Sequence, residues 1–72
     1  MVLLKANSQE PYVVELRFFD FSSRILEDVI EVEKTFNQYK FPTSREKYLI
    51  KTKDNLFSVF ADTVEDISWH IQ

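Results

Sequence analysis

Residues 22–39, SSRILEDVIEVEKTFNQY, are the stretch on which the fold of this chain depends. The stretch contains neither glycine nor proline, and its apolar side chains recur at intervals of three and four residues, as on one face of an α-helix. Asp20, Ser22 or Ser23 could cap the start of such a helix. The spacing therefore predicts one long helix over residues 22–39, with an apolar stripe of Ile25, Val29, Val32, Phe36 and Tyr39.

The composition of the same stretch favours an alternative. Isoleucine, valine and threonine recur in it, and β-branched residues have a lowered helix propensity. A strand over residues 28–36 would alternate acceptably until Lys34 interrupts its apolar face. The length of the stretch favours the helix, and a small all-β barrel is the alternative if these residues are extended.

Two strands are predicted before this stretch, over residues 2–5 and 12–19, with turn-forming residues 7–11 between them. The second strand alternates with period two. One of its faces is apolar and the other mixed, which is typical of an antiparallel sheet with one solvated side. The apolar face consists of Tyr12, Val14, Leu16 and Phe18.

Beyond Pro42, residues 47–53 and 56–61 predict a hairpin with its turn at Asp54 and Asn55. Residues 62–72 are ambiguous: Thr63 to Asp66 resembles a helix capping box, whereas the residues after it also alternate as in a strand. We favour a short C-terminal helix. The predicted fold is a single α+β domain over residues 1–72, in which a four-stranded antiparallel sheet packs against the long helix.

The composition limits the classes of function. The chain has 72 residues, 44% of them hydrophobic and none of them cysteine, so a disulfide framework and a cysteine-based zinc site are excluded. No apolar run is long enough for a signal peptide or a membrane span, so we expect a soluble, cytoplasmic protein. A core this small supplies only about 3–5 kcal/mol of net stability, which favours a homodimer or attachment to another protein.

Catalytic and metal chemistry have little support in the sequence. His70 is the only histidine, and the absence of glycine excludes a phosphate-cradling loop. Asp62, Asp66 and His70 are spaced four apart, so a helix would align them on one face, where carboxylates and imidazole could hold a divalent ion. A lone histidine near a terminus is more typical of the surface. We predict no enzyme, no metal site and no cofactor.

Charge is segregated along the chain. Residues 20–33 carry a net charge of −4, residues 40–53 carry +4, and residues 54–72 return to −4. In one interpretation the basic segment pairs with the acidic one at the surface. In the other it binds nucleic acid, because lysines beside aromatic rings are typical of single-strand binding proteins, although the sequence pI near 5.0 argues against this. The candidate residues are Lys40, Phe41, Arg45, Lys47, Tyr48, Lys51 and Lys53.

The aromatic content is high for so short a chain, at 15% of the residues. Phe18, Phe19 and Phe21 cannot all point inward from the end of one strand, because neighbours alternate between faces. One interpretation buries Phe18, packs Phe21 at the helix entrance and leaves Phe19 exposed. The other predicts an apolar surface rimmed by charge, which marks an interaction site. We therefore predict a protein-interaction or regulatory module that binds its partner through Phe19, Leu49, Phe57 and Val59.

Overall fold

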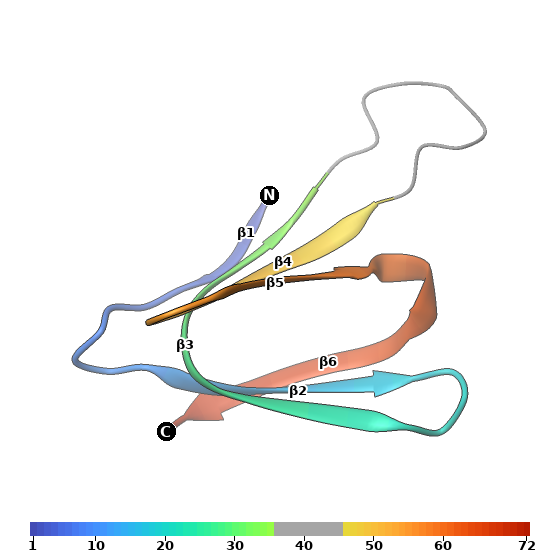
Figure 1. Cartoon of the computed structure of the whole chain (residues 1–72), viewed down its shortest axis with the longest axis horizontal. Helices are drawn as coiled ribbons and strands as arrows, with labels where there is room; N and C mark the ends of the chain where they lie inside the picture. The colour runs from blue at the N-terminus through green and yellow to red at the C-terminus, as the bar shows by residue number, and fades with distance from the viewer. Residues whose placement is uncertain (36–45) are drawn as a thin grey trace.

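Six antiparallel strands and one short 3₁₀ helix account for the regular structure in the described part of the chain. The computed structural model describes residues 1–35 and 46–72. The strands form one sheet in the order β5-β4-β3-β2-β6, and β1 pairs with β3 beside β2 (Figure 1). The elements are β1 (Val2–Lys5), β2 (Tyr12–Phe18), β3 (Ser23–Lys34), β4 (Lys47–Thr52), β5 (Leu56–Phe60), η1 (Ala61–Thr63) and β6 (Val64–Ile71).

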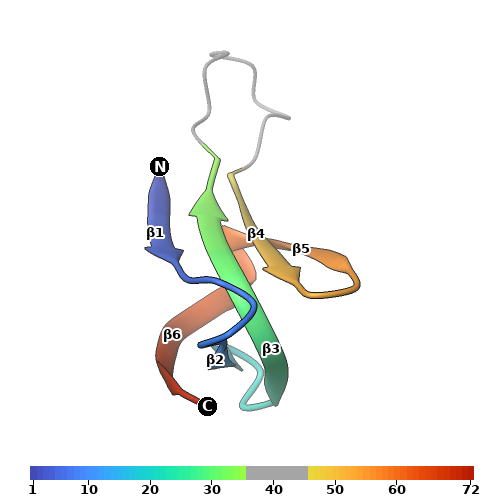
Figure 2. The same cartoon turned by 90° about the vertical axis from the view of Figure 1, so that its left-hand side faces the viewer.

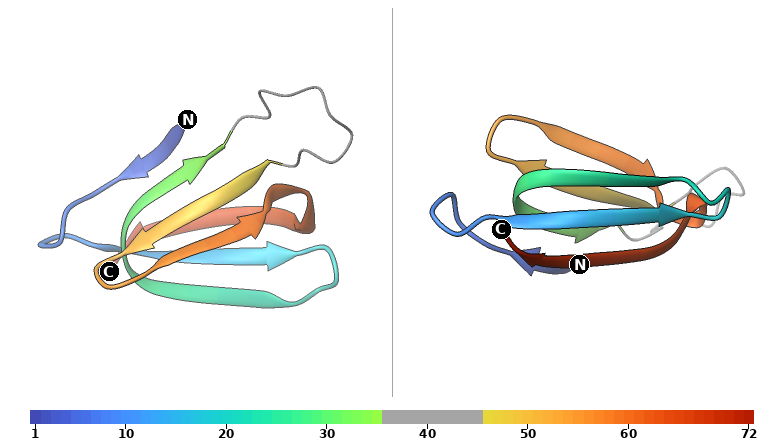
Figure 3. Two further views of the ribbon diagram at one scale, coloured as in Figure 1. Left: turned by 45° about the horizontal axis from the view of Figure 1, so that its top comes forward. Right: turned by 90° about the horizontal axis from the view of Figure 1, so that it is seen from below.

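β3 organises the sheet because it is long and strongly bent. Its first half pairs with β2, and its second half lies between β1 and β4 (Figure 2). The bend lies near Asp28, which has a positive φ of 57° and whose carbonyl accepts a hydrogen bond from the Lys53 N–H at 3.1 Å. As a result the sheet folds over, so that β4 and β5 lie across from β2 and β6 (Figure 3).

The core lies between these two halves of the sheet. Arg24 of β3 reaches from one half to the other, and its guanidinium carbon lies 5.0 Å from the ring centroid of Phe57 in β5. Four strands contribute the buried apolar side chains, so burial joins residues that are far apart in sequence. These side chains are Val14, Leu16, Leu26, Val29, Val32, Ile50 and Val64.

The predicted long helix over residues 22–39 is wrong, because Ser23–Lys34 within this range form the strand β3. Its buried residues Leu26, Val29 and Val32 are spaced by three, although a regular strand buries every second residue. Irregularities in the pairing with β2 and with β4 insert an extra β3 residue at each place. Two bulges thus convert a period of two into an apparent helical period. Residues 36–39 lie outside the described residues.

The predicted C-terminal helix is also wrong, since residues 64–71 form β6. The pairs Leu16–Ile67 and Val14–Trp69 place the alternating apolar residues on the core face of the sheet. The α+β fold is therefore incorrect, and the all-β alternative fits the structure. The predicted strands 2–5 and 12–19 and the hairpin of residues 47–53 and 56–61 are confirmed as β1, β2, β4 and β5, within one residue at each end.

Candidate protein-interaction site

The turn between β2 and β3 is fixed by backbone and side-chain hydrogen bonds. The Phe21 N–H donates to the Phe18 carbonyl at 3.1 Å, and the Phe18 N–H donates to the Ser22 carbonyl at 2.9 Å. The Asp20 carboxylate accepts hydrogen bonds from the Ser22 N–H, at 2.9 Å, and from the Ser22 hydroxyl. Aspartate is a common turn residue because its side chain can accept from the backbone two residues later.

Two phenylalanines project from this turn, and we call Phe19 and Phe21 the aromatic tip. Phe21 has a φ of 70°, in the left-handed region that bulky side chains rarely occupy. Phe21 is 97% exposed and Phe19 is 62% exposed. Phe18, by contrast, packs against the core. The turn therefore presents two large apolar side chains to solvent, one of them from an unfavourable backbone conformation.

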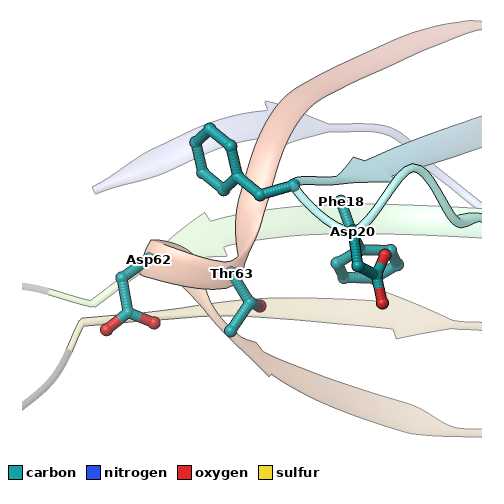
Figure 4. A pocket seen from close by; sticks show the side chains of 5 residues that line it. Phe18, Asp20, Asp62 and Thr63 are labelled. Carbon is teal, nitrogen blue, oxygen red and sulfur yellow. The ribbon is translucent and has the colours of Figure 1, made fainter.

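A pocket of about 370 Å³ lies between the aromatic tip and η1. The Phe19 N–H donates to the Thr63 carbonyl at 3.3 Å, which holds the turn against η1. In Figure 4, Phe18 and Asp20 come from the β2 end and the turn, while Asp62 and Thr63 come from η1. The pocket thus combines the phenylalanine rings with carboxylates from two elements.

A second pocket, of about 270 Å³, has the turn and β6 in its wall, and Phe21 lines it. Glu15 and Glu65 contribute carboxylates to it. Arg17 also lines it, but its guanidinium is paired with the Asp66 carboxylate at 2.8 Å. The surroundings of the aromatic tip are therefore acidic on both sides.

The titration of two groups near the tip follows from their hydrogen bonds. The Ser22 hydroxyl and N–H donate to Asp20 and lower the pKa of its carboxyl below the usual 3.8, so Asp20 is ionised at neutral pH. The hydrogen bond and charge of Asp66 raise the pKa of Arg17. The negative charge at the turn thus belongs to the folded state at neutral pH.

The four residues predicted to bind a partner do not share one surface. Phe57 and Val59 pack against the core, as does Tyr48, whose cross-strand partner is Val59. Leu49 lies on the opposite face of β4, where it pairs with Ser58. Phe19 belongs to the aromatic tip. The pairing of β4 with β5 therefore separates Leu49 from the two residues that were grouped with it.

The basic segment lies along acidic neighbours where the structure describes it. Lys51 is directly opposite Glu31, and the Lys53 Nζ is 3.8 Å from the Asp28 carboxylate. The Lys47 Nζ lies 5.0 Å from the ring centroid of Phe60. The proposed nucleic-acid residues Lys40, Phe41 and Arg45 fall outside the described residues.

The described residues contain no group of three or more histidine, cysteine, aspartate or glutamate side chains that could hold a metal ion. Asp62 lies in η1, and β6 carries Asp66 and His70, so the helical alignment considered for these three does not form. No helix in residues 1–35 and 46–72 has the length and apolarity needed to cross a membrane.

One of the two interpretations of the sequence packed Phe21 at a helix entrance, and neither named Phe21 as a binding residue, so its exposure was missed. The Asp20-Phe21-Ser22-Ser23 run was the available signal, because aspartate and serine between two strands favour a tight turn. Comparison of the chain with family models, with curated proteins and with solved structures finds no match.

Proposed function

We propose that this chain is a small protein-interaction module that binds its partner through the aromatic tip. The observation that carries the proposal is Phe21, a bulky apolar side chain that is almost fully exposed and has a positive φ. Strained backbone and exposed aromatic residues both tend to occur at functional sites, since neither stabilises the isolated fold. Their coincidence in one residue supports a role in binding.

The chemistry around the tip specifies the partner. Aromatic side chains supply much of the affinity of protein interfaces when they enter an apolar pocket or cover one. Asp20, Glu15 and Glu65 place negative charge around Phe19 and Phe21. The partner segment is therefore both apolar and basic, and the carboxylates speed its association and exclude acidic competitors. We expect this interaction to occur in the cytoplasm and to involve no catalysis.

The test is capture of partners by the tagged full chain from lysate of its own cells, with Phe19→Ser and Phe21→Asn as tip variants. Ile25→Ser and Leu56→Ser are matched controls, because both residues are exposed and apolar but lie outside the tip. We expect a defined protein that both tip variants lose and both controls keep. Retention of every partner by the tip variants would contradict the proposal.

A nuclease-treated portion of the same lysate separates this function from nucleic-acid binding. A partner held by the aromatic tip survives the treatment, and its capture falls only modestly as salt is raised. Binding through phosphates falls steeply with ionic strength. Loss of all captured proteins on nuclease treatment would favour the basic segment of residues 40–53 instead.

A further inference from the structure

The outer edge of β6 carries backbone groups with no strand beside it among the described residues. β2 pairs with the other edge, and the Gln72 N–H donates to the Pro11 carbonyl at 3.1 Å. In an antiparallel pair, alternate residues direct their N–H and C=O groups to the same neighbour. Counting back from Gln72, the residues that direct these groups to the open edge are Ile67, Trp69 and Ile71.

The side chains of Ile67, Trp69 and Ile71 lie on the face of the sheet that carries the core, and they continue this apolar face past the buried residues. Trp69 pairs with the fully buried Val14, so the two lie on one face of the sheet, yet Trp69 is 37% exposed. Ile71, paired with Tyr12, is 65% exposed. β6 therefore combines an open hydrogen-bonding edge with an apolar row that the described residues cover only in part. Such an edge is a template for another strand.

We propose that a second copy of this chain covers the edge, with the two β6 strands antiparallel about a two-fold axis through Ser68. In a continuous antiparallel sheet, two residues that lie opposite each other have their side chains on the same face. A two-fold axis perpendicular to the sheet therefore passes between one residue and the same residue of the second copy. Ser68 at the axis places Asp66 opposite His70 of the second copy and Ile67 opposite its Trp69. An axis at Asp66 would oppose two carboxylates, which is unfavourable.

The pairs next to the axis are complementary on both faces of the sheet in the Ser68 register. On the outer face a carboxylate meets an imidazole, which can donate a hydrogen bond to it. On the core face isoleucine meets tryptophan, an aromatic and β-branched pair of the kind that stabilises sheets. The open backbone groups of Ile67 and Trp69 become hydrogen-bonded to each other across the axis.

The other end of the sheet is less suited to this pairing. β5 has five residues against eight in β6, and the groups at its open edge belong to Leu56, Ser58 and Phe60. The Phe60 carbonyl already accepts a hydrogen bond from the Thr63 hydroxyl at 2.7 Å. The Arg24 guanidinium also lies over Phe57 in the middle of β5. These contacts leave β6 as the more available edge for self-association.

Cysteine cross-linking tests both the edge and the register, since the chain has no cysteine of its own. Ser68 and Ser58 are exposed serines in the two end strands of the sheet, so Ser58→Cys is the matched control for Ser68→Cys. At the axis, facing Cα atoms are about 4.5 Å apart, within the range that a disulfide spans. Under mild oxidation we expect Ser68→Cys to form a covalent dimer roughly tenfold faster than Ser58→Cys, because association raises the effective thiol concentration.

Sedimentation of cysteine-free variants supplies the second measurement. We expect the wild-type chain to sediment as a dimer and Trp69→Lys to sediment as a folded monomer by circular dichroism. If Trp69→Lys fails to fold, His70→Asp replaces it, because it opposes two carboxylates on the outer face and weakens the dimer at least severalfold. A monomeric wild-type chain, or faster cross-linking of Ser58→Cys, would overturn the inference. The aromatic tip plays no part in these measurements, so their outcome is independent of the proposed function.

Discussion

Asp28 and Phe21, the two positive-φ residues among residues 1–35 and 46–72, occupy similar backbone conformations in very different surroundings. Asp28 has a φ of 57° at the bend of β3, and Phe21 has a φ of 70° in the turn before it. The Asp28 N–H donates to the Gln72 side-chain oxygen at 2.7 Å, and the Gln72 amide donates back to the Asp28 carboxylate at 2.9 Å. Phe21, in contrast, extends an almost fully exposed ring into solvent.

The contrast separates a structural use of backbone strain from a functional one. Aspartate tolerates the left-handed region better than most residues, and at position 28 it also ties the bend of β3 to the end of β6. The hydrogen bonds between Asp28 and Gln72 therefore offset the free-energy cost of the positive φ at Asp28. At Phe21 the Asp20–Ser22 hydrogen bonds support the turn, but the almost fully exposed phenylalanine itself adds little buried contact to offset the cost. A residue that costs stability and exposes apolar surface is best explained by a binding partner. Substitutions at Asp28, at Phe21 and at the turn that carries Phe21 test the two uses of strain separately.

The largest effect is expected from Asp28→Val. Valine is β-branched and poorly suited to positive φ, and it lacks the carboxylate that accepts a hydrogen bond from the Gln72 amide, so we expect a loss of about 2 kcal/mol in the free energy of unfolding. The measurement is urea denaturation followed by circular dichroism. The C-terminal half of β6 should also lose protection in hydrogen exchange, because Gln72 is then held to the bend by one hydrogen bond in place of two.

Two further substitutions divide this loss into its causes. Asp28→Gly tolerates the backbone conformation but lacks the side chain, so it should lose only about 1 kcal/mol. Asp28→Asn keeps an acceptor for the Gln72 amide and the tolerance of positive φ, and should remain close to wild type. Equal losses for the valine and glycine variants would mean that the backbone conformation at position 28 costs nothing, and the comparison with Phe21 would fail.

Phe21→Asn is expected to act in the opposite direction. Asparagine accepts the left-handed region more readily than phenylalanine, so this variant should unfold with a free energy about 1 kcal/mol higher than wild type. The same variant is expected to lose the captured partner. Gain of stability with loss of binding is the signature of a residue kept for function. A Phe21→Asn variant less stable than wild type would instead assign the ring a structural contact.

Sequence reasoning succeeded where strands are regular and failed where they bend. β2 alternates with period two, and the turn residues Asp54 and Asn55 marked the β4–β5 hairpin, so these strands were identified. β3 contains bulges near Asp28, and a bulge shifts the phase of the alternation, so Leu26, Val29 and Val32 took on helical spacing. The β-branched composition of residues 22–39 indicated a strand, and it was a better guide to the fold than the length of the stretch.

The candidate site was only partly accessible to the sequence. Phe19 was identified because neighbouring residues at a strand end must face opposite ways. The grouping of Leu49 with Phe57 and Val59 depended on cross-strand register, which a single strand pattern does not specify. The open edge of β6 was hidden by the preference for a C-terminal helix. Tertiary pairing therefore decided which apolar residues became surface.

The smallest predicted effect concerns the carboxylate that supports the turn carrying Phe21. Hydrogen bonds from Ser22 lower the pKa of Asp20 in the folded state below 3.8, so folding favours the ionised form. The stabilisation is complete only well above the unfolded-state value of 3.8 and is lost as pH falls through the folded-state pKa. The difference in unfolding free energy between wild type and Asp20→Ala should be constant at neutral pH and shrink below about pH 4. Ser22→Ala removes the hydroxyl donor but keeps the N–H, so it should move this transition to higher pH. A difference that persisted unchanged at pH 2 would show that the Asp20 charge does not hold the turn, and the strain at Phe21 would then lack its local support.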